Sequence, residues 1–124
     1  MSVIVSNVHA TEDYVKQKII LGARRSGWQV CDAQNRSLEL YRDYKDWFVL
    51  LKAPYSWKGY ALEVDTKRTT LKNEDGEVHR AVNKLMQKAA RTIDAASPGP
   101  ESDARAREPI PTCREVSKMS ARSR

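Results

Sequence analysis

The chain has 124 residues, with 22 Lys and Arg against 16 Asp and Glu and a formal net charge of +6. This length suits a single domain, and no stretch approaches the about 18 apolar residues that cross a membrane. The positive charge favours an anionic partner such as nucleic acid. We therefore expect no membrane partner and place nucleic acid first among macromolecular partners.

The N-terminus and the cysteines bear on the compartment. Residues 1–7 lack the basic start and the apolar run of a secretory signal. Cys31 and Cys113 are far apart, and two distant cysteines do not indicate a disulfide framework. We therefore expect a cytoplasmic protein with reduced cysteines.

Apolar residues are distributed unevenly along the chain. All aromatic side chains lie between Tyr14 and Tyr60, and the segment after residue 95 is rich in Ser, Pro, Arg and Glu. A segment that buries little apolar surface cannot offset the loss of its chain entropy on folding. The sequence predicts one domain over residues 1–95 and a disordered basic tail over residues 96–124.

The first predicted elements are a short strand over residues 2–6 and a helix over 12–25. Thr11 suits the N-cap of this helix, because its hydroxyl can accept a free N–H of the first turn. Val15 and Ile19 belong to an apolar stripe at helical spacing. Gly27 suits the left-handed position after the helix.

The pattern then changes to that of strands, with alternating or continuous apolar residues and turn residues between them. The predicted strands lie at 28–31, 37–41, 47–51 and 60–67, with residues 69–72 as a possible extension. An amphipathic helix follows over 74–93, capped by Asn73. These elements predict an α+β fold of order α-β-β-β-(β)-α, with an antiparallel three- to four-stranded sheet packed against two amphipathic helices.

Basic residues gather on the polar side of the second helix and just before it. This predicted basic stripe comprises Lys67, Arg68, Lys72, Arg80, Lys84, Lys88 and Arg91. Lys and Arg side chains on one face can neutralise several phosphates. The stripe is our main candidate for nucleic-acid contact, and a simply solvated helix face is the alternative interpretation.

The segment over 41–60 interleaves aromatic and basic residues. We predict that Trp47 and Phe48 belong to the core. Tyr55 and Trp57 lie among turn signals, where both are hard to bury. Exposed aromatic rings stack on bases or anchor protein interfaces, so these two residues are our second candidate contact site.

Five residues suggest a possible catalytic site, namely Glu12, Asp46, Glu63, Asp65 and Lys67. Asp46 precedes one strand, and Glu63 or Asp65 lies ahead of Lys67 in the next. This arrangement resembles the PD-(D/E)XK nucleases, in which carboxylates hold Mg²⁺ and a Lys stabilises the attacked phosphate. The resemblance implies a metal-dependent nuclease, active or degenerate, as an alternative function.

The element order is also similar to that of double-stranded RNA-binding domains, which place a basic N-terminus of the second helix on phosphates. Here that terminus is acidic over residues 73–77, and it would repel phosphate. We therefore do not predict this mode of binding.

Our leading hypothesis is a small, non-enzymatic intracellular protein that binds nucleic acid, either DNA or RNA, without a metal or small-molecule cofactor. The first alternative is an inhibitor or adaptor of the mobile-element type that docks on a protein complex through the Tyr/Trp turn and the Glu/Asp strand face. The second is the nuclease described above.

Overall fold

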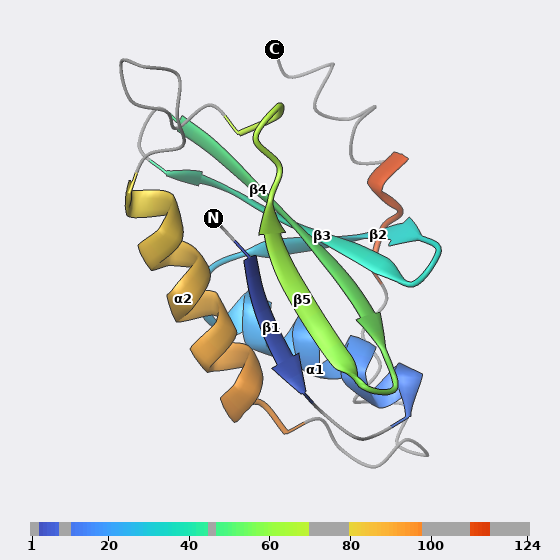
Figure 1. Ribbon diagram of the computed structural model, residues 1–124. Coiled ribbons are helices and arrows are strands. Elements are labelled where there is room, and N and C mark those ends of the chain that lie inside the picture. Colours follow the sequence, from blue (N-terminus) through green and yellow to red (C-terminus); the bar gives the residue numbers. More distant parts are fainter. Residues whose placement is uncertain (1–2, 8–10, 45–46, 70–79, 98–109, 115–124) are drawn as a thin grey trace.

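The structure is a computed structural model that describes residues 3–7, 11–44, 47–69, 80–97 and 110–114. Its elements in chain order are β1 (Val3–Asn7), α1 (Glu12–Arg25), β2 (Gln29–Gln34), β3 (Ser37–Tyr44), β4 (Trp47–Ser56), β5 (Gly59–Val64) and α2 (Arg80–Ala95) (Figure 1). The predicted α+β fold with two helices is confirmed. The sheet has five strands, because the short N-terminal strand joins it.

All neighbouring strands in the sheet are antiparallel, in the order β1-β5-β4-β3-β2. The strands from β2 to β5 form the predicted meander, with β4 in the centre. β1 pairs with β5, with Val3 opposite Glu63 and Asn7 opposite Gly59. The two edges of the sheet are therefore β1 and β2.

Helix α1 begins and ends at the residues that its sequence predicts. The Thr11 hydroxyl accepts the Tyr14 N–H at 3.2 Å, which satisfies one free donor of the first turn. After the helix, Gly27 has a φ of 89°, a conformation that glycine adopts without strain. The described part of α2 begins at Arg80 and ends two residues beyond the prediction, whereas its predicted first turn and cap lie outside the described residues.

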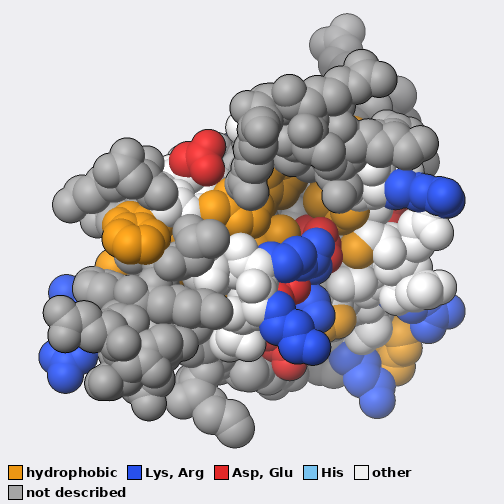
Figure 2. Space-filling model, turned by 90° about the horizontal axis from the view of Figure 1, so that it is seen from above, with side chains coloured by type: hydrophobic (Ala, Val, Ile, Leu, Met, Phe, Trp, Pro, Cys, Tyr) orange, Lys and Arg blue, Asp and Glu red, His pale blue; other side chains and the backbone are white. Residues whose placement is uncertain are grey.

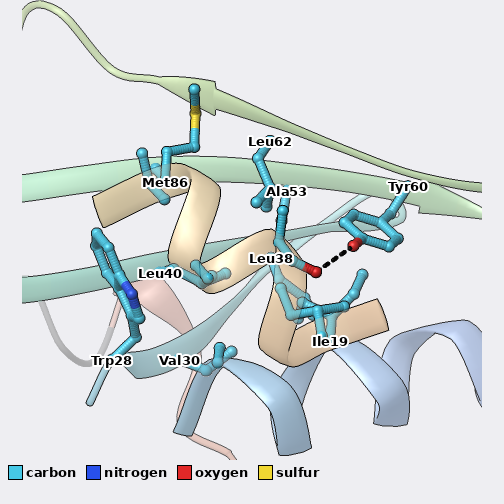
Figure 3. Packing of buried hydrophobic residues seen from close by; sticks show 14 of the residues in the cluster. Ile19, Trp28, Val30, Leu38, Leu40, Ala53, Tyr60, Leu62 and Met86 are labelled. Carbon is cyan, nitrogen blue, oxygen red and sulfur yellow. Dashed lines mark hydrogen bonds between the residues drawn. The ribbon is translucent and has the colours of Figure 1, made fainter. Parts of the chain in front are cut away.

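Both helices pack on one face of the sheet and enclose the core (Figure 3). Leu38, Leu40 and Leu62 point from the strands toward Ile19 of α1 and Met86 of α2. The helices approach closely at Gly22, where an added Cβ would lie 2.3 Å from the Cα of Ile93. No helix among the described residues is long and apolar enough to cross a membrane.

The opposite side of the sheet, termed here the second face, carries the alternate residues of the strands. Lys52 is in register with Glu39 on β3 and with Glu63 on β5. Cys31 and Glu39 are likewise opposite each other on β2 and β3. Because residues in register point to the same side of a sheet, these side chains share the second face.

Residues 110–114 return to the edge of the sheet beside β2 (Figure 1). The Asp32 N–H donates to the Pro111 carbonyl at 2.9 Å, and Ile110 packs against the core. Cys113 forms a disulfide with Cys31, so the expectation that the cysteines remain reduced and unpaired is wrong for this structure. The physical reason is that the returning segment places two cysteines 82 residues apart side by side. The division of the chain at residue 95 stays a prediction, although these described residues of the predicted tail contact the domain.

Every strand differs in its bounds from the prediction, and β2 and β3 each end three residues later than predicted. β4 continues through Pro54 to Ser56. Pro54 has no N–H to donate, but the strand stays bonded here because the Tyr55 N–H donates to the Arg36 carbonyl. Its first residue, Trp47, is 42% exposed instead of buried, since it lies at the end of the strand. β5 ends at Val64, because the next residue, Asp65, starts a turn.

Candidate nucleic-acid interface

The exposed side of α2 carries four basic residues, which we term the basic face of α2: Arg80, Lys84, Lys88 and Arg91. Burial of Val82, Met86, Ala89 and Ile93 against the core turns this side of the helix outward. At 100° per residue, the four positions fall within an arc of about 80° and extend over about 16 Å of the helix axis.

The ion pairs among the described residues do not involve this face. None of its four cations forms an ion pair with another described residue. The acid of the same helix, Asp94, lies about 40° beyond the arc. Its carboxylate accepts a hydrogen bond from the Tyr60 hydroxyl at 2.6 Å.

The structure divides the predicted basic stripe. Arg68 donates to Glu39, which lies on the second face, whereas α2 covers the other face of the sheet. Lys67, the residue before it, is exposed in the turn after β5. Lys72 lies outside the described residues. Arg68 and Lys67 are therefore not continuous with the basic face of α2, and Arg68 is already neutralised by acids.

Arg68 belongs to a compact group of charged side chains, termed here the charge cluster, which comprises Glu39, Lys52, Asp65 and Arg68. The Arg68 guanidinium contacts the Glu39 carboxylate at 2.5 Å and the Asp65 carboxylate at 2.7 Å. Lys52 lies 3.9 Å from Asp65. Figure 2, seen from above, shows basic and acidic side chains interleaved near the middle of this view. Glu39 and Asp65 are each only 8% exposed, so their charges depend on these partners.

The turn after β5 positions Asp65 and Arg68. One carboxylate oxygen of Asp65 accepts the backbone N–H groups of Lys67 and Arg68 at 3.1 and 3.0 Å. Thr69 then closes the turn, since its N–H donates to the Asp65 carbonyl at 2.9 Å, and its hydroxyl joins the turn to β4 by accepting the Leu50 N–H at 3.1 Å. Burial raises the pKa of Asp65, but the hydrogen bonds from Arg68 outweigh it and hold the pKa below its usual value. The hydrogen bond to Glu39 in turn raises the pKa of Arg68.

The predicted aromatic contact site is also divided. Trp57 is 53% exposed at the β4–β5 turn, with the Lys58 ammonium 5.3 Å from its ring centroid. Tyr55 instead lies in β4 and packs partly against the core. Burial raises the pKa of Tyr55, and the charges of nearby Asp32, Glu12 and Asp13 raise it further. These acids make the surroundings of Tyr55 unsuitable for phosphate.

The residues of the nuclease hypothesis do not meet at one point among the described residues. Glu12, at the start of α1, pairs with Arg36 at 3.0 Å on the helix-covered side of the sheet. Glu63 lies on the second face opposite Lys52, and the Asp65 carboxylate is engaged by Arg68. Asp46 lies outside the described residues, and Lys67 is exposed beyond β5. The described residues therefore do not assemble a nuclease site.

Three residues of the second face, Glu39, Lys52 and Cys31, were not predicted from the sequence as site residues. Glu39 and Lys52 belong to the charge cluster, and Cys31 lies beside it, with its Sγ 3.9 Å from a Glu39 oxygen. The alternation of β3 already indicates that Glu39 points away from the core. Asp65 and Arg68 are also spaced three apart, which suits a turn with a side-chain hydrogen bond. Local patterns give no signal that would join Cys31 to Cys113.

Comparison with known proteins adds no assignment. No protein-family model, curated protein or solved structure matches the chain.

Proposed function

We propose that this protein is a small, non-enzymatic binding protein that contacts nucleic acid through the basic face of α2. The observation that carries the proposal is the group of four exposed cations within one arc of the helix, without an ion-pair partner among the described residues. Lys and Arg side chains at such spacing neutralise backbone phosphates and release counterions. The proposal includes a cytoplasmic location and no small-molecule cofactor.

The spacing of these residues suits contacts to the phosphate backbone. Arg80, Lys84 and Lys88 follow one another at intervals of about 6 Å along the axis. Phosphate contacts position a protein on nucleic acid but carry no sequence information. We therefore expect binding with weak sequence preference and a steep dependence on salt.

The first prediction is that the double variant Lys84→Glu/Lys88→Glu binds nucleic acid at least about tenfold more weakly than the wild type at low salt. Loss of two phosphate contacts should also reduce the slope of log affinity against log salt by about 1.5. Fluorescence anisotropy of labelled single- and double-stranded DNA and RNA, titrated with the full chain over a salt series, measures both quantities.

The matched control is Lys67→Glu/Arg114→Glu, which changes the net charge equally at two exposed positions outside both α2 and the β4–β5 turn. We expect this control to stay within about threefold of the wild type, because its two positions make no phosphate contact and change only the overall charge of the protein. Equal losses for the two double variants would show that total charge, and not the basic face, governs binding. No binding by the wild type at low salt would refute the nucleic-acid proposal.

The exposed Trp57 can serve either a nucleic-acid partner or the alternative partner, a protein complex. The β4–β5 turn and the C-terminal end of α2 lie at the same end of the molecule (Figure 1), and Tyr60 near this turn bonds to Ala90 and Asp94 of α2. A single strand that follows the basic face of α2 toward its C-terminal end thus continues toward the Trp57 ring. Exposed Trp residues are equally typical of protein hot spots, which supports an inhibitor or adaptor as the second candidate.

The second prediction is that Trp57→Ala weakens single-strand binding by about 1–3 kcal/mol, as for loss of one stacked base, and leaves duplex binding nearly unchanged. Stability should change by no more than about 0.5 kcal/mol, because the ring is largely exposed. The same anisotropy assay and a urea titration measure these effects. If Trp57→Ala instead abolishes salt-resistant capture of a protein while nucleic-acid binding is unaltered, the adaptor function replaces the nucleic-acid proposal.

A further inference from the structure

A polar hollow of about 330 Å³ lies beside the disulfide on the second face. The C-terminal segment lines it with Thr112, Cys113 and Arg114, and the charge cluster contributes Glu39 and Arg68. The hollow thus borders Cys113, one of the two cysteines of the disulfide.

The two cysteines differ in accessibility. Cys31 is 2% exposed and does not line the hollow, whereas Cys113 is half-buried and does. A reagent that enters the hollow therefore reaches Sγ of Cys113 before Sγ of Cys31. Disulfide exchange requires such access, because the attacking thiolate must approach one sulfur of the bond.

We propose that the Cys31–Cys113 disulfide is a site of exchange with a small thiol that carries carboxylate groups. Among the lining residues, exposed Arg114 offers a guanidinium to a carboxylate, whereas the Asp32 carboxylate already pairs with Lys16 at 3.3 Å. Glutathione has this chemistry and serves as the probe. The exchange is independent of nucleic-acid binding.

The reaction takes place in two steps. The thiolate of the small thiol attacks Sγ of Cys113, and a mixed disulfide forms between them. The Cys31–Cys113 bond breaks, and its electron pair goes to Sγ of Cys31, which takes a proton from solvent. The thiolate of a second small thiol then attacks the small thiol's sulfur in the mixed disulfide. Sγ of Cys113 leaves with the electron pair and takes a proton, and the two small thiols end as one disulfide. Two small thiols thus supply two electrons, and both cysteines end as thiols.

The consequence of exchange is release of residues 110–114 from the edge of β2. The disulfide links this segment covalently to β2. The Asp32–Pro111 hydrogen bond and the partial burial of Ile110 also attach it to the domain. The strand that this segment covers is a sheet edge, which presents backbone groups to another chain when uncovered. Exchange at Cys113 thereby opens the β2 edge.

The first test follows the reaction of the oxidised full chain with glutathione by mass spectrometry, in native buffer and at rising urea below the unfolding transition. We expect the first adduct on Cys113 and a rate that changes less than about twofold over this urea range, as for a reaction of the native state. A first adduct on Cys31 would overturn the proposal. So would a rate that rises with urea from the lowest concentrations, since it would show that the disulfide reacts only after global unfolding.

The second test uses Arg114→Gln, with uncharged β-mercaptoethanol as the comparison thiol. We expect glutathione to react about threefold more slowly with the variant, and β-mercaptoethanol to react at the wild-type rate. Equal rates for wild type and variant with glutathione would refute recognition by Arg114. In wild-type protein, amide exchange of Asp32 should become at least about tenfold faster after reduction. An unchanged Asp32 exchange rate would refute release of the segment.

Discussion

Replacement of Arg68 by Ala is expected to lower the free energy of unfolding by about 2–4 kcal/mol. The substitution leaves Glu39 and Asp65, each 8% exposed, without their main cationic partner. Loss of one partner from a fully buried ion pair costs about 3–5 kcal/mol. We expect a smaller loss here because the Arg68 side chain is 50% exposed, so that water reaches the pair and screens it. Urea unfolding monitored by Trp fluorescence measures the change.

Two neighbouring substitutions serve as controls for this prediction. Arg68→Lys keeps the charge but loses the planar fork that contacts both carboxylates, so we expect an intermediate loss. Lys67→Ala removes an exposed side chain beside it, and we expect a change within about 0.5 kcal/mol. If Arg68→Ala behaves like Lys67→Ala, the charge cluster is not a stabilising feature of this fold.

The pH dependence of the Arg68→Ala effect follows from Asp65. The pKa of Asp65 is lowered in the folded state despite its burial, because the Arg68 hydrogen bonds favour the ionised carboxylate. A lowered folded pKa stabilises the protein above the unfolded value of about 4, and this contribution is lost as the pH falls through the folded pKa. We therefore expect the stability difference between wild type and Arg68→Ala to be largest near neutral pH and to shrink below about pH 4. A difference that is constant from pH 7 to pH 3 would exclude this origin.

The fold was predictable from the sequence to the extent that local patterns determine it. Thr11, the Val15–Ala23 stripe and Gly27 are local signals that together define α1, and the structure has the helix at the predicted residues. Alternation in β5 likewise predicted that Tyr60 and Leu62 point inward. The strand over 2–6 was predictable as an element. Its pairing with β5 was not, because it depends on how the distant β5 folds back beside it and not on the residues of the strand itself. Trp47 was misplaced because its residue type indicates burial, whereas its place at a strand end leaves it exposed.

The candidate site was predictable only for the part that lies on one helix. The basic face of α2 follows from helical spacing alone. Arg68 was grouped with it because it is near in sequence, but the turn at Asp65 directs it to Glu39 across the sheet. The Cys31–Cys113 pair depends on the path of the chain over a sequence separation of 82, which no local pattern encodes. Tertiary contacts of this kind decide the chemistry of the second face.

Replacement of Cys113 by Ser is expected to lower the free energy of unfolding by about 4 kcal/mol. The disulfide closes a loop with a sequence separation of 82, and the chain-entropy relation gives about 4.5 kcal/mol for a loop of this length. A typical domain is stable by only about 5–15 kcal/mol, so this single bond is a large part of the total. Urea titrations of oxidised wild type and of the variant, at equal protein concentration, measure the difference.

Three comparisons separate the effect of the cross-link from other effects of the substitution. Wild-type protein in excess reductant should lose the same stability as Cys113→Ser, because both open the same loop. Cys31→Ser should lose about 1–3 kcal/mol more, since Cys31 is buried and a hydroxyl there needs a new hydrogen-bond partner. A Cys31→Ala/Cys113→Ala variant should resemble Cys113→Ser and be insensitive to reductant. If reduction leaves the stability of the wild type unchanged, the disulfide holds residues 110–114 at the β2 edge without stabilising the domain against unfolding.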